Sequence, residues 1–170
     1  RIAAAAEAAG RSASDVSLIA VSKGHGPQAI EQAWEAGARR FGESRVQEAL
    51  AHWPERRPGL ELHLIGRLQT NKAKAAVRTF DLIHTLDREK LARALAAEMT
   101  AQNRKLPCFV EVNIGSEPQK AGVAPEDTER FVELCRAELG IQVAGLMCIP
   151  PAGEEPAPYF ALLREHARRL

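Results

Sequence analysis

The sequence predicts an α/β fold built on a parallel β-sheet, and two observations lead to this prediction. Short apolar segments rich in β-branched residues recur six times, each followed by a longer segment with helical periodicity. The apolar segments, such as LIAV and FVEVNI, are nearly continuous, which is typical of strands in a parallel sheet covered by helices. The chain of 170 residues is 45% hydrophobic and 26% charged, which suits a single globular domain over residues 1–170.

The alternation places each element along the chain. The predicted strands are residues 16–23, 39–44, 60–66, 82–87, 107–115 and 141–150. The predicted helices are residues 27–36, 46–56, 71–80, 88–104 and 125–139, with a last helix after Pro158. Residues that favour helix starts, among them Asn71, Asp87 and Pro125, open several of these helices.

Two architectures fit this order of elements: an open doubly wound sheet and a closed TIM-type (β/α)8 barrel. A complete barrel takes about 250 residues. Under the second architecture the chain therefore holds only about the first six βα units.

Composition narrows the class of function. Lys and Arg number 23 against 22 Asp and Glu, a net charge of +1 that argues against binding nucleic acid or an anionic membrane by bulk charge. The three cysteines, Cys108, Cys135 and Cys148, lack the spacing of a disulfide framework or a zinc site, and a reducing cytoplasm fits best. No apolar run reaches the roughly 18 residues of a membrane span, and the opening lacks the features of a signal peptide. Because the chain does not begin with Met, we expect its start to have been trimmed.

Lys23 stands at the carboxyl end of the first predicted strand, in the segment LIAVSK. Reactive groups of parallel α/β folds collect at the carboxyl ends of the strands. Apolar surroundings favour the neutral amine of a lysine, which is a nucleophile toward carbonyl groups. The other five lysines fall in predicted helices or loops, so Lys23 is the one candidate for Schiff-base chemistry. The alternative is a strand-terminal lysine whose ammonium group reaches solvent.

The segment that follows Lys23 matches a dinucleotide-binding pattern. Residues 24–29 read G-x-G-x-x-A, and Glu43 lies about 20 residues further on. Pro27, however, lacks the backbone N–H that a phosphate would use at a helix start. A loop with Pro27 at the first helical position explains the same residues.

Other strand ends carry polar or soft side chains. Residues 41–48 and 62–72 cluster polar groups where strand meets helix, which suits either a polar ligand or ordinary helix capping. His63, inside an apolar strand, is more typical of a core residue than of a ligand or base. Met147 is expected to pack in the core, and Cys148 is expected to act as a small buried hydrophobe.

Six blocks in this order closely resemble the pyridoxal phosphate homeostasis protein family, single-domain relatives of the alanine racemase N-terminal barrel. The resemblance covers nearly the whole chain. The blocks are IAVSKG (19–24), FGESRVQEAL (41–50), LHLIGRLQTNKAK (62–74), IHTLDREKLA (83–92), VEVNIGSEPQKAGV (110–123) and GLMCIPP (145–151).

The resemblance implies a TIM-type barrel that carries pyridoxal 5′-phosphate as an internal aldimine on Lys23. It also implies that Ser44, His63 and Met147 lie around the cofactor. Family members usually have Asn at the position of Ser44, where the hydroxyl can still donate and accept a hydrogen bond. The family's last two strands, whose loops hold the phosphate, have no counterpart here, so we expect a barrel that is incomplete at its C-terminal end.

The resemblance favours a carrier that binds pyridoxal phosphate reversibly on Lys23 and serves intracellular cofactor homeostasis without turnover. Pyridoxal-phosphate-dependent apoenzymes would receive the cofactor, and the protein would be a cytoplasmic monomer or weak dimer. The first alternative is an amino-acid racemase, which needs an acid or base on each face of the substrate, whereas the only tyrosine, Tyr159, lies in the Pro-rich tail. The second alternative is an NAD-dependent dehydrogenase that uses the glycine pattern.

Overall fold

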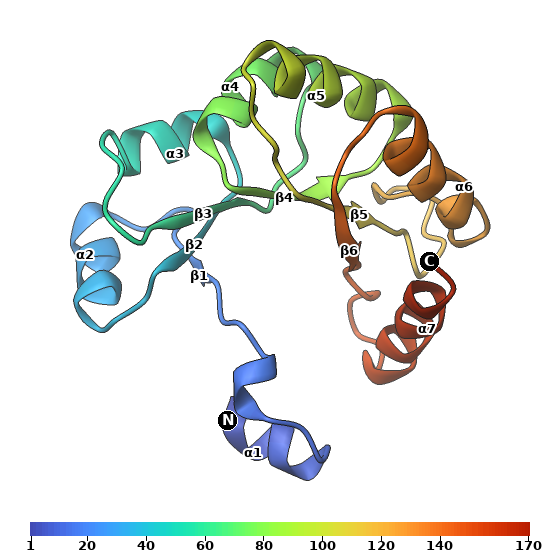
Figure 1. The fold of residues 1–170 in the computed structure, drawn as a ribbon. Coiled ribbons are helices and arrows are strands. Elements are labelled where there is room, and N and C mark those ends of the chain that lie inside the picture. The colour runs from blue at the N-terminus through green and yellow to red at the C-terminus, as the bar shows by residue number, and fades with distance from the viewer.

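A computed structural model describes all residues 1–170. Its centre is one parallel sheet of six strands in the order β1-β2-β3-β4-β5-β6, so each strand pairs with the next one in sequence. The sheet curves, and β1 and β6 form its two edges (Figure 1). The strands are β1 Ala20–Val21, β2 Arg40–Glu43, β3 Glu61–Leu64, β4 Leu82–Leu86, β5 Cys108–Glu111 and β6 Val143–Met147.

Five helices, α2 to α6, cover the convex side of the sheet, while α1 and α7 lie beyond its two edges (Figure 1). The α-helices are α1 Ile2–Ala8, α2 Pro27–Glu35, α3 Val46–His52, α4 Ala73–Thr79, α5 Glu89–Ala101, α6 Thr128–Glu133 and α7 Ala157–Arg168. The shorter turns are η1 Ala13–Asp15, η2 Thr70–Lys72, η3 Pro125–Asp127 and η4 Leu134–Glu138. No helix is long and apolar enough to cross a membrane.

The sequential strand order excludes the doubly wound sheet. The dinucleotide-binding interpretation of residues 24–29, which depends on that sheet, is therefore wrong. A doubly wound sheet reverses its strand order and carries helices on both faces, whereas here the order never reverses. The segment instead forms a tight turn in which Gly24 has φ +72°, followed by α2 with Pro27 at its start. Glu43 is fully buried, so it cannot contact a ribose. The six βα units are those of the barrel architecture.

Element boundaries differ from the sequence prediction at both ends of the fold. Only Ala20 and Val21 of the first predicted strand are in register with β2, and the Ser22 amide adds one further hydrogen bond to Gly42. The alanine-rich opening forms helix α1, which the composition did not predict. Asp87 does not cap α5: its buried carboxylate pairs with Arg67 and Arg88, and the helix begins at Glu89.

The main core lies between the sheet and its covering helices. Phe41 of β2 pairs with Leu62 of β3, while Leu64 of β3 pairs with Ile83 of β4, which pairs with Cys108 of β5. Each of these five residues is at most 1% exposed. Phe41 packs against Trp53, with ring centroids 4.7 Å apart. Because side chains alternate along a strand, the intervening residues of the same strands point to the concave side.

Candidate functional site

Lys23 lies just past the carboxyl end of β1, beside the end of β2. Val21 pairs with Gly42, and the Ser22 amide donates to the Gly42 carbonyl at 3.0 Å. Continuing this register by two residues brings Lys23 level with Ser44 at the mouth of the curved sheet. Lys23 is exposed and forms no ion pair. Lys23 therefore matches the alternative of a strand-terminal lysine that reaches solvent, not that of an amine buried among apolar side chains.

Ser44 is half-buried at the end of β2, where β3 comes very close. A Cβ atom on Gly66 would lie only 2.3 Å from the Ser44 carbonyl oxygen. Only glycine allows this approach, so Gly66 fixes how the ends of β2 and β3 pack. The Ser44 backbone is therefore in close contact with Gly66 at the end of β2.

The concave surface below Lys23 is apolar. A Cβ atom at Gly42 would lie 3.1 Å from both Ile19 and Ile65 side chains, so these two residues close over the glycine. Val21, on the same face of β1, is 42% exposed. Lys23 thus stands above a small apolar surface that a planar ring could cover.

His63 lies deeper on the concave side than Lys23 and Ser44, because it pairs with Gly42. It is 4% exposed, and its Nδ1 lies 2.8 Å from His84 Nε2, so one ring donates a hydrogen bond to the other. Its Nε2 lies 3.1 Å from a Glu61 oxygen in a geometry that forms no hydrogen bond. His84 in turn packs on Phe109 at 5.0 Å. His63 is therefore a buried member of the concave wall.

Burial sets the ionisation of this histidine pair. It lowers the pKa of His84 to about 4, helped by the neighbouring His63. It also lowers the pKa of His63, although the Glu61 carboxylate opposes the shift. The pair is therefore neutral near pH 7 and presents no positive charge to a ligand.

Met147 lies on the opposite edge strand, β6, half-buried and paired with Glu111 of β5. Burial, reinforced by Asp87, raises the pKa of the Glu111 carboxyl. Sequence analysis did not single out Glu111, although an acid inside the apolar run FVEVNI was a usable signal. Cys148 packs against the core but is only half-buried, less than the sequence predicted, and its partial burial raises the pKa of the thiol.

A buried polar chain behind Lys23 was also missed. The Ser22 hydroxyl donates to Glu43 Oε1 at 2.6 Å, and His52 Nδ1 of α3 lies 2.7 Å from the same oxygen. Glu43 is 0% exposed, and its Oε2 has no hydrogen-bond partner. This chain, which we call the Ser22–Glu43–His52 chain, ties the end of β1 to β2 and α3. Lys23 is the residue that follows Ser22 in the chain.

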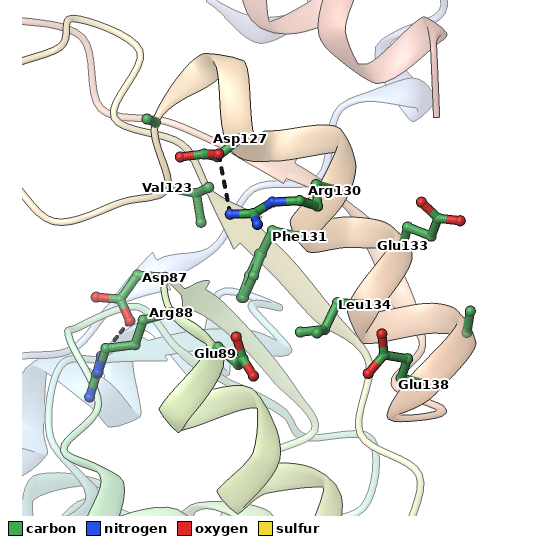
Figure 2. A pocket seen from close by; sticks show the side chains of 12 residues that line it. Asp87, Arg88, Glu89, Val123, Asp127, Arg130, Phe131, Glu133, Leu134 and Glu138 are labelled. Atoms are coloured by element: carbon green, nitrogen blue, oxygen red, sulfur yellow. Dashed lines mark hydrogen bonds and ion pairs between the residues drawn. The ribbon is translucent and has the colours of Figure 1, made fainter.

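The structure thus brings Lys23 and Ser44 together, sets His63 deeper on the concave wall, and places Met147 at the far edge. No group of three or more His, Cys, Asp or Glu side chains could hold a metal ion. A separate pocket of about 510 Å³ lies between the start of α5 and helix α6 (Figure 2). None of the four sequence-predicted site residues lines it.

Comparison with known proteins identifies the family of the chain. The family model for the alanine racemase N-terminal domain matches residues 1–170. The pyridoxal phosphate homeostasis protein of Aquifex aeolicus is 40% identical over 169 residues, covering 97% of this chain and 74% of the relative. That of Pseudomonas aeruginosa is 39% identical with the same two coverages.

Solved structures show the same fold. PipY of Synechococcus elongatus with pyridoxal phosphate bound is 38% identical, with a TM-score of 0.83 over 99% of this chain and 81% of that chain. An alanine racemase of Clostridium difficile is 14% identical, with a TM-score of 0.72 over 91% of this chain and 43% of that chain, and shares the fold alone. The chain belongs to the alanine racemase N-terminal domain family and, within it, to the pyridoxal phosphate homeostasis proteins.

Proposed function

We propose that this protein binds pyridoxal 5′-phosphate through Lys23 and takes part in intracellular cofactor homeostasis. One observation carries the proposal. Lys23 is the lysine at the carboxyl end of a strand, its ammonium group is free of ion pairs, and it lies level with Ser44 at the mouth of the sheet. Support comes from the PipY structure with pyridoxal phosphate bound, to which this chain is 38% identical.

The residues present fit such a group. The apolar surface formed by Ile19, Gly42 and Ile65 offers a floor for an aromatic ring. Lys23 supplies a primary amine, Ser44 a hydroxyl, and Met147 a soft side chain from the opposite edge. When bound, pyridoxal phosphate supplies an aldehyde carbon, with which a lysine amine forms a C=N bond and releases one water molecule. Residues 1–170 would provide this side of the site as the first six units of the barrel.

We further propose that the protein does not turn over amino acids. Racemisation requires an acid or base on each face of the substrate. The only tyrosine, Tyr159, lies at the start of α7, where its hydroxyl donates to Glu154 and this contact raises its pKa. His63 is buried against His84 and is not free to exchange protons at the mouth. The names of the relatives agree with a homeostatic role.

The recipients that we propose are pyridoxal-phosphate-dependent apoenzymes of the cytoplasm, served by a monomer or weak dimer. A carrier needs a site that an incoming partner can reach. The exposed position of Lys23 supports this requirement, because the amine is reachable without unfolding any element.

The test is covalent mapping of the cofactor. The protein is incubated with pyridoxal phosphate, reduced with borohydride and digested, and the peptide masses are measured. We expect one reduced adduct on the peptide that contains Lys23, and its loss in Lys23→Ala. Lys90→Ala, which removes an exposed lysine on α5, is the matched control and should leave the adduct unchanged. An adduct of equal yield in Lys23→Ala would refute the proposal.

A further inference from the structure

A second pocket lies over the carboxyl ends of β2 and β3, on the helix side of the Lys23 region. Its volume is about 650 Å³, within the range of small-molecule sites. Four cationic side chains line it: Arg45, Arg67, Lys72 and Arg88. No Asp or Glu is among its lining residues. In a chain whose net charge is only +1, this is a strong local concentration of positive charge.

Two of the four cations are held in place by the protein. Arg67 lies 3.3 Å from the buried carboxylate of Asp87, and Arg88 pairs with the same carboxylate. Arg88 also donates to the Leu68 carbonyl at 2.8 Å and to the Thr70 hydroxyl at 3.3 Å. The single Asp87 carboxylate therefore pairs with two arginines, so one of their two positive charges is not neutralised.

The other two cations have no such partner. Neither Arg45 nor Lys72 has a carboxylate within ion-pair distance, although nearby Arg40, Arg56 and Arg57 each have one. Lys72 is half-buried and Arg45 is exposed, and the protein supplies no counter-charge to either. An anion in the pocket would supply that counter-charge.

The pocket of Figure 2 differs from this pocket in the charge of its lining residues. It also includes Arg88, but it is lined by Asp87, Glu89, Asp127, Glu133 and Glu138. Its remaining cation, Arg130, is turned toward Asp127 (Figure 2). The two pockets flank the Asp87–Arg88 pair and have opposite charge, so the positive charge is confined to the pocket over β2 and β3.

We propose that the pocket lined by Arg45, Arg67, Lys72 and Arg88 binds a small phosphorylated molecule. Arginine presents planar N–H donors that match phosphate oxygens, and lysine adds a compact charge. The side-chain amides of Gln47 and Gln69 add further donors to the lining. The site does not depend on Lys23, but Ser44 forms part of its wall, so its ligand would lie next to the mouth described above.

The experiment measures binding of inorganic phosphate and of glycerol 3-phosphate by calorimetry at constant ionic strength. The proteins are the wild type, Lys23→Ala, and Arg45→Gln/Lys72→Gln. We expect the wild type and Lys23→Ala to bind equally, and the double variant to bind at least about tenfold more weakly, since each charge-assisted contact contributes about that factor. Arg78→Gln/Lys90→Gln removes the same charge from exposed helix positions without ion pairs and should leave binding unchanged.

The two phosphate compounds distinguish the possible natural ligands of the pocket. Tighter binding of glycerol 3-phosphate than of inorganic phosphate identifies an esterified ligand, and the reverse identifies free phosphate. Equal binding in the wild type and in Arg45→Gln/Lys72→Gln overturns the proposal, as does binding of an acidic peptide without binding of either phosphate. Loss in Lys23→Ala alone would place the phosphate at the Lys23 site, which also overturns it. Cofactor labelling of Lys23, measured separately, tests the proposed function independently.

Discussion

The two faces of the sheet follow different physical rules. The convex face packs against α2 to α6 through apolar side chains, among which Phe41, Leu62 and Ile83 are at most 1% exposed. The concave face carries His63, His84, Phe109 and Glu111; the first three contact one another, and Glu111 pairs with Met147. The convex face therefore supplies stability, while the concave face and its rim supply ionisable groups and room for a ligand.

The largest loss of stability should come from a substitution on the convex face. Phe41→Ala removes a side chain that is 1% exposed and packs on Trp53 at 4.7 Å. We expect the free energy of unfolding to fall by about 3–5 kcal/mol, because burial is lost and a cavity remains. Urea denaturation followed by far-UV circular dichroism measures this change. Leu18→Ala is the control, since Leu18 is 71% exposed, and a similar loss there would break the comparison between packed and open surfaces.

The histidines of the concave face should instead make the free energy of unfolding depend on pH. His84 has a pKa of about 4 in the fold, whereas an unfolded histidine titrates near about 6.5. Between these values the unfolded chain binds a proton that the native protein does not, so stability falls as pH falls. We expect a loss of about 1 kcal/mol between about pH 6.5 and pH 5, because solvent partly screens the half-buried ring. His63, whose pKa is also lowered, adds to the same slope.

Two substitutions test whether the histidine pair causes this pH dependence of stability. His84→Gln keeps a polar side chain beside His63 but removes the titrating ring, so the slope of unfolding free energy against pH should flatten. His25→Gln replaces an exposed histidine and should leave the slope as in the wild type. If the slopes of His84→Gln and the wild type coincide, the histidine pair is not the source of the pH dependence.

Sequence patterns predicted the parts of this fold that depend on neighbouring residues. Strands and helices with a clear apolar period, such as β3 and α5, were found because burial on a fixed face repeats along the chain. Lys23 was found because it ends a strand, whereas Ser44 was named only because the family resemblance implies it. Helix α1 was missed because alanine-rich residues show no polar and apolar alternation.

Contacts between distant residues could not be predicted in the same way. His63 and His84 are 21 residues apart and meet only through the register of β3 and β4. Glu43 was considered only as the acid of the dinucleotide pattern, yet it is 0% exposed, which is rare for a glutamate. Its partners Ser22 and His52 come from β1 and α3, and only the assembled sheet brings them to it.

A comparable effect tests the one polar exception on the convex side, the Ser22–Glu43–His52 chain. Glu43→Gln keeps the shape and one oxygen acceptor but removes the carboxylate that Ser22 and His52 share at 2.6 Å and 2.7 Å. Hydrogen bonds to charged groups exceed neutral ones by about 1–2 kcal/mol, so unfolding free energy should fall by about that amount. Denaturation in urea measures it, with Glu89→Gln as control, because the exposed pair of Glu89 and Arg93 contributes only about 0.5 kcal/mol.

The same variant separates stability from positioning. If the chain only stabilises the fold, Glu43→Gln and a variant of equal stability loss elsewhere in the core should release pyridoxal phosphate at the same rate. If it also holds the end of β1, release from Glu43→Gln should be faster than from the matched core variant, because Ser22 precedes Lys23 and loses its charged partner. Equal release rates would show that the convex face contributes stability alone, and that the division between the two faces of the sheet is complete.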